Sequence, residues 1–281
     1  MKVGIIGAGK VGFSMGRYLV ENGIELTGYF SKSKESSLEA SNFTKSKSYQ
    51  KLADIVRDSE VLFITVPDDM IGVIWEQIKE LNVSDKIFCH CSGVLSSKVF
   101  LNIADYGCYG YSIHPLLAVS DKYHSYKEFS SILFTIEGSK EKFNIMKELF
   151  EGCGNKVISI KPEDKIRYHG AAVLSSNLVL GLLETAVEEL TNCGFTREDA
   201  FEALIPFMYK NVEHLKNQSI EESLTGPVER GDVSTVNKHM DKFEGDNREI
   251  YRLLSKKALN IAKRKNPQRD YVYLEEQINE K

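Results

Sequence analysis

The sequence predicts an α/β protein in two parts, a doubly wound parallel sheet over residues 1–160 and an all-α domain over residues 161–281. Three observations support this fold class. A glycine-rich turn follows a short apolar run at the start of the chain. Apolar runs of strand length then alternate with amphipathic helical patterns to about residue 160. From Lys161 onward, only helical patterns remain.

The glycine-rich turn has the pattern G-x-G-x-x-G. It consists of Gly7, Ala8, Gly9, Lys10, Val11 and Gly12. A strand-like run precedes it and a helical pattern follows, which is the context that a dinucleotide site requires. The first glycine permits a tight turn, the second lets a pyrophosphate approach, and the third allows close packing of helix on strand. Free N–H groups at the helix N-terminus then face the phosphates. The motif predicts a Rossmann domain; a purely structural turn is the alternative.

The end of the second predicted strand, Glu25 to Phe30, indicates which dinucleotide binds. NAD-specific sites place a carboxylate near this point, where it bonds the ribose 2′-hydroxyl. Here Ser31, Lys32 and Ser33 follow the strand, and the first carboxylate is Glu35. Hydroxyl and ammonium groups suit a 2′-phosphate, so we expect NADP (NADPH) to be preferred over NAD. The alternative is an ordinary solvated turn.

Further strands complete the predicted sheet. They are Val61 to Val66, Lys86 to Cys91, Tyr109 to Ile113, Ile132 to Ile136 and Val157 to Ile160, with helices at Leu38 to Phe43, Leu52 to Arg57, from Pro67 onward, and at Lys140 to Phe150. Ligands of open parallel sheets bind beyond the carboxyl ends of the strands. We therefore expect the residues that follow two of these strands to contact the cofactor. They are Val66, Pro67, Asp68, Ser92 and Gly93.

The sequence Cys89-His90-Cys91 lies within a predicted strand. Neighbouring residues of a strand point to opposite faces, and no second cysteine pair accompanies it, so packed thiols are favoured over a metal site. We expect no bound metal.

The helical half contains an unusually apolar segment. The stretch Ala171 to Leu190 is apolar nearly all round in its first half, which is typical of a helix buried on several sides. A small domain could hardly surround it alone, so we expect a homodimer formed through the helical domain. Ser175, Ser176 and Asn177 interrupt the segment. Their partners would be neighbouring backbone, or equally a nicotinamide and substrate. A last helix is predicted from Asn247, with one apolar face. That face carries Ile250, Leu253, Leu254, Ala258 and Ile261.

The overall composition limits the kinds of partner. The chain has 281 residues, 42% of them hydrophobic and 27% charged, with a net charge of −4, so no basic field favours nucleic acid. No apolar run approaches the roughly 20 residues of a membrane span, and the start lacks a signal-peptide pattern. Five cysteines, an odd number without a framework spacing, suit reduced thiols. We expect a cytoplasmic protein that binds neither nucleic acid nor membrane.

Four motifs of the second half carry a family resemblance. They are His114-Pro115-Leu116, Phe134 to Gly138, Tyr168 to Ala172 running on to Ser176-Asn177, and Leu224 to Asp232, with the sequence LTGPVERGD. In this order they resemble a bacterial family of Rossmann-like proteins designated NADP oxidoreductases, with a helical C-terminal domain. That family is similar in architecture to pyrroline-5-carboxylate reductase and, more distantly, to the 6-phosphogluconate dehydrogenase superfamily. The resemblance implies a helical domain that dimerises and closes over the nicotinamide.

The resemblance also assigns roles to individual residues. It implies that His114 follows a strand end and faces the nicotinamide, and that Ser175, Ser176 and Asn177 lie close to the site of hydride transfer. It implies that a loop containing Thr225, Gly226 and Arg230 closes the substrate pocket, with the partner subunit as a possible donor of this loop. The superfamily's lysine, four residues before the asparagine, is replaced here by Val173. A lysine acid–base mechanism therefore does not carry over.

Hydride delivery to a C=O or C=N bond leaves charge on oxygen or nitrogen, so a proton donor or a polarising hydrogen bond is needed. Histidine is the commonest general acid near neutral pH. His169 and His114 are the candidates, and His169 is favoured because Ser175 and Ser176 are expected to follow on the same helix. For each histidine, a structural role is the alternative. Arg230 could bind a substrate carboxylate, or equally form an internal salt bridge with Glu229 or Asp232.

Two functions remain open from the sequence. The first is an NADPH-dependent dehydrogenase or reductase of a small carboxylated imine, ketone or aldehyde, with Ser176 and Asn177 among its catalytic residues and Ser175 at the substrate. The second is an NADP-binding sensor or regulatory protein without turnover. The fold does not distinguish them.

Overall fold

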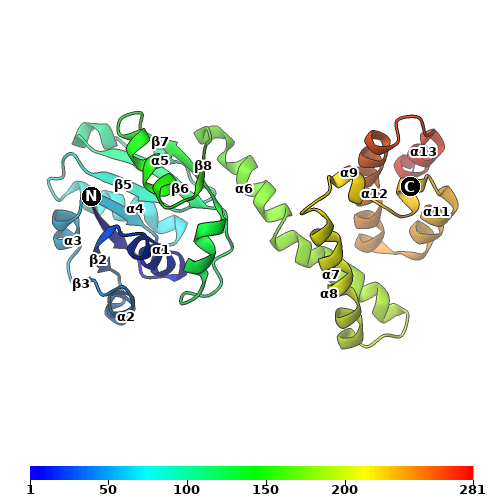
Figure 1. The fold of residues 1–281 in the computed structure, drawn as a ribbon, viewed down its shortest axis with the longest axis horizontal. Coiled ribbons are helices and arrows are strands. Elements are labelled where there is room, and N and C mark those ends of the chain that lie inside the picture. Colours follow the sequence, from blue (N-terminus) through cyan, green and yellow to red (C-terminus); the bar gives the residue numbers. More distant parts are fainter. Residues whose placement is uncertain (281) are drawn as a thin grey trace. The chain divides into compact units, whose positions relative to one another are not determined.

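The computed structural model describes residues 1–280 (Figure 1). By their internal contacts these divide into two compact units, Met1–Leu174 and the remainder from Ser175. The predicted boundary at residue 160 marks the end of the last strand, whereas the division between the units falls after the next helix. The two units are described separately below.

The first unit is built on one eight-stranded sheet. Its strands are β1 (Lys2–Ile6), β2 (Glu25–Phe30), β3 (Lys47–Tyr49), β4 (Val61–Ile64), β5 (Ile87–His90), β6 (Tyr109–Pro115), β7 (Leu133–Gly138) and β8 (Lys156–Ser159). Their order in the sheet is β3-β2-β1-β4-β5-β6-β7-β8, and every pair is parallel except β6 with β7. The order reverses between β1 and β4, which makes this a doubly wound sheet. The predicted fold class is confirmed.

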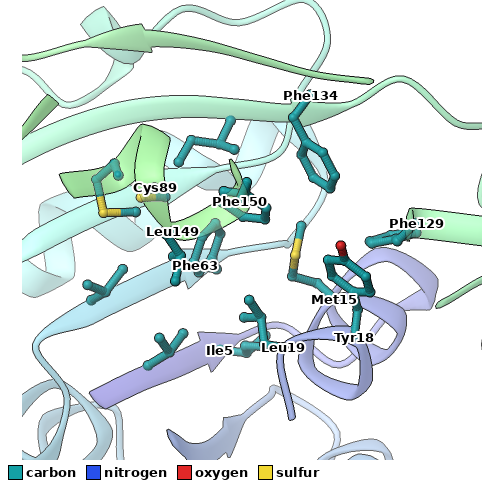
Figure 2. Close-up of a cluster of buried hydrophobic side chains, with 14 of the residues drawn as sticks. Ile5, Met15, Tyr18, Leu19, Phe63, Cys89, Phe129, Phe134, Leu149 and Phe150 are labelled. Carbon is teal, nitrogen blue, oxygen red and sulfur yellow. The ribbon is translucent and has the colours of Figure 1, made fainter. Parts of the chain in front are cut away.

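Helices pack on both faces of this sheet (Figure 1). They are α1 (Lys10–Glu21), α2 (Lys34–Thr44), α3 (Leu52–Asp58), α4 (Asp68–Lys79) and α5 (Phe143–Gly152), and a further helix, α6 (Lys165–Leu174), follows the last strand. Because successive residues of a strand point to opposite faces of the sheet, each strand contributes side chains to both hydrophobic cores. Ile5 and Phe63 pack with α1 and α5, and Figure 2 shows them in that cluster. Leu62 and Ile64 face the opposite way, into a cluster with the buried Trp75 of α4. Such burial on both faces explains the continuous apolar runs of the parallel strands.

Two details of the first unit differ from the predictions. The short strand β3 was not expected, because its Lys-Ser-Tyr sequence has no apolar run. His114 does not follow a strand end as the resemblance implied. It lies inside β6 and pairs with Thr135 of the antiparallel neighbour β7, which extends β6 beyond the apolar residues that suggested its end.

The second unit is helical throughout its described residues. Its helices are α7 (Asn177–Asn192), α8 (Arg197–His214), α9 (Ile220–Ser223), α10 (Pro227–Arg230), α11 (Val233–Lys242), α12 (Gly245–Lys265) and α13 (Val272–Glu280). Helices α7 and α8 pack on each other around Leu183, Val187 and Ala200. The other helices enclose a separate core. It contains Val228, Val236, Met240, Leu259, Ala262, Tyr271, Leu274 and Ile278.

Two helical predictions were wrong in detail. The stretch Ala171 to Leu190 is not one helix, because α6 ends at Leu174 and α7 begins at Asn177, so His169 and the serines do not share a helix. In α12 the buried residues are Ser255, Leu259 and Ala262, whereas Leu253 and Leu254 are exposed. The core face is therefore displaced from the predicted one, and α13, which packs on it, was not predicted.

The segment Pro162–Asn192 is more apolar than expected. By length and composition it could cross a membrane, and little of its most apolar window is buried. The expectation that no run approaches the length of a membrane span was therefore wrong on these criteria. One such segment is weak evidence for a membrane protein, and it leaves an apolar surface that needs an explanation.

Candidate functional site

The glycine turn between β1 and α1 has the geometry of a phosphate cradle. Gly7 has a φ of +107°, a conformation that L side chains rarely adopt. A β-carbon on Gly12 would lie 2.3 Å from the carbonyl oxygen of Gly7, so only glycine lets α1 pack this closely. In contrast, a β-carbon on Gly9 would meet nothing within 4 Å. The turn is thus tight at its two ends and open in the middle, as a pyrophosphate requires.

The N-terminus of α1 is available to a ligand. Gly9 is its N-cap and supplies no side-chain hydrogen bond, and the first turn contains no acidic residue. Lys10 is exposed, and Ala8 is buried beneath the turn. Unbonded N–H groups and the positive end of the helix dipole favour an anion at this point. The residues of the turn therefore fit the diphosphate of a dinucleotide.

The end of β2 lies beside the glycine turn, because the amide of Gly7 donates a hydrogen bond to the carbonyl of Phe30. Ser31 and Lys32 follow directly, and Lys32 is exposed. Ser33 has a structural role: its hydroxyl caps α2 and donates to Glu35, and bonds from this first turn lower the pKa of the Glu35 carboxyl. Ser31 and Lys32 thus remain the residues suited to a 2′-phosphate.

The connection after β4 lies at the same carboxyl edge of the sheet as the glycine turn and the end of β2. The hydroxyl of Thr65 donates to the carbonyl of Gly7 at 2.8 Å, which ties this connection to the glycine turn. Val66 is half-buried, whereas Pro67 and Asp68 are exposed. Asp68 accepts a hydrogen bond of 2.7 Å from the hydroxyl of Ser92, at the end of β5. The predicted cofactor neighbours after β4 and β5 therefore share one edge of the sheet.

Gly93 brings two histidines together at this edge. A β-carbon on Gly93 would lie 2.5 Å from Cδ2 of His169 and 2.9 Å from Nε2 of His114. Both imidazoles therefore rest against the Gly93 backbone. His114 comes from β6 and His169 from α6, so residues far apart in the sequence converge here. The two candidate histidines are therefore neighbours within the first unit.

Tyr168 holds the ring of His114. Its hydroxyl lies 2.8 Å from Nδ1 of His114, and the two rings meet edge to face. Burial lowers the pKa of His114 to about 4, and the charges of Lys165 and His169 act in the same direction. Burial also raises the pKa of Tyr168. His114 is therefore neutral at pH 7, and Tyr168 is a protonated phenol that can hold the imidazole in place.

The cluster contains one functional candidate that the sequence analysis missed. Lys165 is 1% exposed, and its ammonium group donates to the carbonyl of Ser92 and to the hydroxyl of Ser112. It occupies the same face of α6 as Tyr168 and His169, three and four residues later. That spacing was the available signal, but no known motif drew attention to it. The strand residues Cys89 and His90 are buried, and desolvation raises the pKa of the Cys89 thiol.

The remaining predicted site residues belong to the second unit. Asn177 is the first residue of α7, and its side-chain oxygen accepts a hydrogen bond from Ser176. Ser175 lies at the break before this helix, and Thr225 is exposed before α10. Gly226 caps α10 with a φ of +98°. The structure does not bring these residues together with the histidines inside one unit.

Arg230 does not make the internal salt bridge considered as its alternative. Glu229 instead pairs with Arg269, and Asp232 caps α11 by accepting hydrogen bonds from Thr235. Arg230 itself is exposed at the end of α10, and no ion pair forms on it among residues 1–280. Its guanidinium forms no ion pair within the described part of the chain, but hydrogen bonds from Thr235 lower the pKa of the nearby Asp232 carboxyl and the charge of Arg230 acts in the same direction.

Two family models match successive parts of the chain, and the second match extends across the boundary between the two units. One, described as a Rossmann-like domain, matches residues 1–115, and another, described as a domain of unknown function (DUF2520), matches residues 132–258. No curated protein sequence matches the chain.

Solved structures resemble almost the whole chain. Protein TM1727 from Thermotoga maritima is 27% identical, with a TM-score of 0.76 and coverage of 94% of this chain and 99% of that chain. The "putative NADP oxidoreductase BF3122" from Bacteroides fragilis is 19% identical, with a TM-score of 0.71 and coverage of 92% and 98%. A pyrroline carboxylate reductase from Plasmodium falciparum, solved with NADP bound, is 15% identical, with a TM-score of 0.58 and coverage of 93% and 99%. In chain order a match to a Rossmann-like domain is thus followed by a match to the DUF2520 domain, which is consistent with the Rossmann-like family that the motifs resemble.

Proposed function

We propose that this protein is an NADPH-dependent oxidoreductase that reduces a C=N or C=O bond of a small, carboxylated substrate. The convergence of His114 and His169 on Gly93, on the same sheet edge as the glycine turn, is the observation that carries this proposal. Along this edge the strands follow in the order β2-β1-β4-β5-β6. The end of β2 therefore suits the adenosine 2′-phosphate, and the ends of β5 and β6 suit the nicotinamide. The structural neighbours named as an NADP oxidoreductase and a pyrroline carboxylate reductase support the same reading.

The bound nicotinamide would supply the hydride, and the side chains would place the substrate and stabilise developing charge. His114 is neutral, so it acts as a hydrogen-bond donor rather than as a strong acid. If the Tyr168 hydroxyl donates to Nδ1, the proton of the imidazole lies on Nε2, the atom beside Gly93. That N–H can polarise the C=N or C=O bond. His169, whose ring also lies against Gly93, is the proposed proton donor.

The test of this function follows NADPH oxidation with a panel of cyclic imines, 2-keto acids and semialdehydes. We expect turnover of at least one class, and we expect His169→Asn to lower kcat roughly 100-fold or more while NADPH affinity changes little. Retention of wild-type kcat in this variant would remove His169 from the mechanism. Tight NADPH binding without turnover on any compound would favour the sensor instead.

The cofactor preference has a separate test. Because no carboxylate ends β2 and Lys32 is exposed there, we expect NADPH to raise the melting temperature more than NADH at equal concentration. Lys32→Glu is expected to reverse this preference by repelling the 2′-phosphate. Equal shifts for the two dinucleotides in the wild-type protein would contradict the proposal.

A homodimer through the helical domain accounts for the apolar surface of α7 and α8. The exposed residues there are Leu178, Leu180, Leu182, Phe201, Ile205, Phe207, Tyr209 and Val212. Leu180 is 66% exposed and Phe207 is 71% exposed, and many large exposed apolar side chains on two packed helices indicate an interface. We propose a second copy of this chain as its partner, because this surface is too apolar to remain in water and belongs to the match region of the family model.

Light scattering tests this dimer. We expect the wild-type protein to have twice the mass of one chain at micromolar concentration, and Phe207→Glu to shift it to one chain, because a buried unpaired charge opposes association. Lys210→Glu, on the same helix, changes charge without removing an apolar side chain and serves as the control. A wild-type protein with the mass of one chain would contradict the proposal.

A further inference from the structure

Lys165 is a costly residue to bury. Its side chain is 1% exposed, and no carboxylate forms an ion pair with it among residues 1–280. Burial lowers its pKa to about 8, although the nearby charges of Glu137, Cys91 and Asp68 act in the opposite direction. An apolar side chain would fill the same space without this desolvation cost. The ammonium group therefore has a role other than packing.

The contacts of Lys165 identify that role. Its Nζ donates to the carbonyl oxygen of Ser92 at 2.8 Å and to the hydroxyl of Ser112 on β6. The hydroxyl of Ser92 donates to Asp68 and accepts the amides of Val94 and Leu95 at 3.1 and 3.0 Å. Both the carbonyl and the side chain of Ser92 are thus fixed, so the turn that contains Gly93 has a defined position.

That turn supports the two histidines. Gly93 contacts His114 and His169 closely enough that a single added methyl group would collide with both rings. Lys165 begins the helix that carries Tyr168 and His169, so one helix holds the turn, the partner of His114 and the second histidine. A shift of the Ser92 carbonyl would move Gly93 and change the spacing of the two imidazoles.

We propose that Lys165 is a positioning residue of this site, whose ammonium group fixes the Ser92–Gly93 turn against His114 and His169. The proposal rests on the function proposed above. The groups that face Lys165 are Asp68 at the start of α4, His90 from β5, Cys91 directly after β5, His114 from β6 and Glu137 from β7. Its positive charge also lowers the pKa of His114. Deprotonation of Lys165 above about pH 8 would weaken its hydrogen bond to the Ser92 carbonyl, and its charge would no longer lower the pKa of His114.

The sequence allows the key bond to be observed directly. Ser92–Gly93 is the one Ser–Gly dipeptide of the chain. Protein labelled with ¹³C at serine carbonyls and ¹⁵N at glycine amides therefore gives a single resonance that joins the carbonyl of Ser92 to the amide of Gly93. We expect the Ser92 carbonyl shift of the wild-type protein to titrate with a midpoint near pH 8. Lys165→Met, which keeps an unbranched side chain, should show no such titration, and Lys165→Arg should stay near the low-pH position.

Two further readouts separate positioning from mere packing. The pKa of His114, followed by its imidazole ¹³C resonance, should rise in Lys165→Met and stay low in Lys165→Arg. With the best substrate of the panel, Lys165→Met should lower kcat roughly 10- to 100-fold with little change in NADPH affinity, and Lys165→Arg should recover part of it. Lys161→Met, an exposed lysine one turn earlier, should match the wild-type protein in every readout.

The outcomes distinguish this proposal from the function on which it rests. A wild-type Ser92 carbonyl that does not titrate between pH 6 and 10, or an identical titration in Lys165→Met, would overturn the role of Lys165, whatever the activity. Absence of turnover on every substrate, with the Ser92 titration as expected, would instead overturn the proposed reductase and leave the Lys165 contact supported.

Discussion

Alanine at Gly9 is expected to abolish high-affinity NADPH binding while leaving the fold intact. A β-carbon there meets nothing within 4 Å, and the backbone φ of −75° suits alanine. The protein alone therefore accommodates the methyl group. A pyrophosphate approaching the N-terminus of α1 does not, because it needs the space above this residue. We expect roughly a 100-fold loss of NADPH affinity, or about 2.7 kcal/mol, with an unchanged melting temperature of the protein without cofactor.

Gly12→Ala provides the contrasting variant. Its methyl group would lie 2.3 Å from both the Gly7 carbonyl oxygen and the Thr65 hydroxyl, so α1 must move away from the sheet. Overpacking of this kind costs about 1–3 kcal/mol. We expect a lower melting temperature as well as weaker binding. Calorimetric titration with NADPH and thermal unfolding of both variants check these results. If Gly9→Ala binds NADPH like the wild-type protein, the glycine turn is structural and does not hold a dinucleotide.

Alanine at Gly93 is expected to cost about 100-fold in kcat. Its methyl group would collide with His169 at 2.5 Å and with His114 at 2.9 Å. His114 cannot easily move, because Tyr168 holds its Nδ1. The collision must therefore displace His169 or the turn itself. Steady-state kinetics should show the loss in kcat. Calorimetric titration should show little change in NADPH affinity, because the glycine turn that holds the pyrophosphate is unaltered.

Gly170→Ala is the matched control for this prediction. Gly170 directly follows His169 on α6, is exposed, and has open space where a β-carbon would lie. Alanine is also more favourable than glycine in the interior of a helix, by about 1 kcal/mol. We expect unchanged kcat and equal or higher stability. Equal activity of Gly93→Ala and Gly170→Ala would show that the histidines beside Gly93 take no part in the reaction.

The candidate cofactor half of the site could be placed from the sequence because its signals are local. The glycine turn is recognised from the strand before it and the helix after it, without knowledge of the rest of the fold. The apolar runs of β4 and β5 are continuous because both faces of these strands are buried. Their carboxyl ends meet at one edge by the geometry of a parallel sheet. The contact of Asp68 with Ser92 illustrates this: both had been predicted as cofactor neighbours from separate strands.

The proposed catalytic half depends on contacts that no local pattern encodes. Lys165 is 73 residues from Ser92, and its burial results from the packing of α6 rather than from any apolar neighbourhood in the sequence. His114 was expected after a strand because the apolar run stops at Ile113, but pairing with Thr135 continues β6. The break after Leu174 was likewise hidden, since Ser175 and Ser176 are compatible with a continuous helix. Contacts between residues distant in the sequence decided the first two of these points.

A crystal structure of the protein in saturating NADPH tests the central claim most directly. The account predicts the pyrophosphate over Gly9 at the N-terminus of α1, the 2′-phosphate beside Ser31 and Lys32, and the nicotinamide ring at the Gly93 turn with His114 and His169 beside it. Electron density for the dinucleotide at any other place, or none along the carboxyl edge of the sheet, would contradict it.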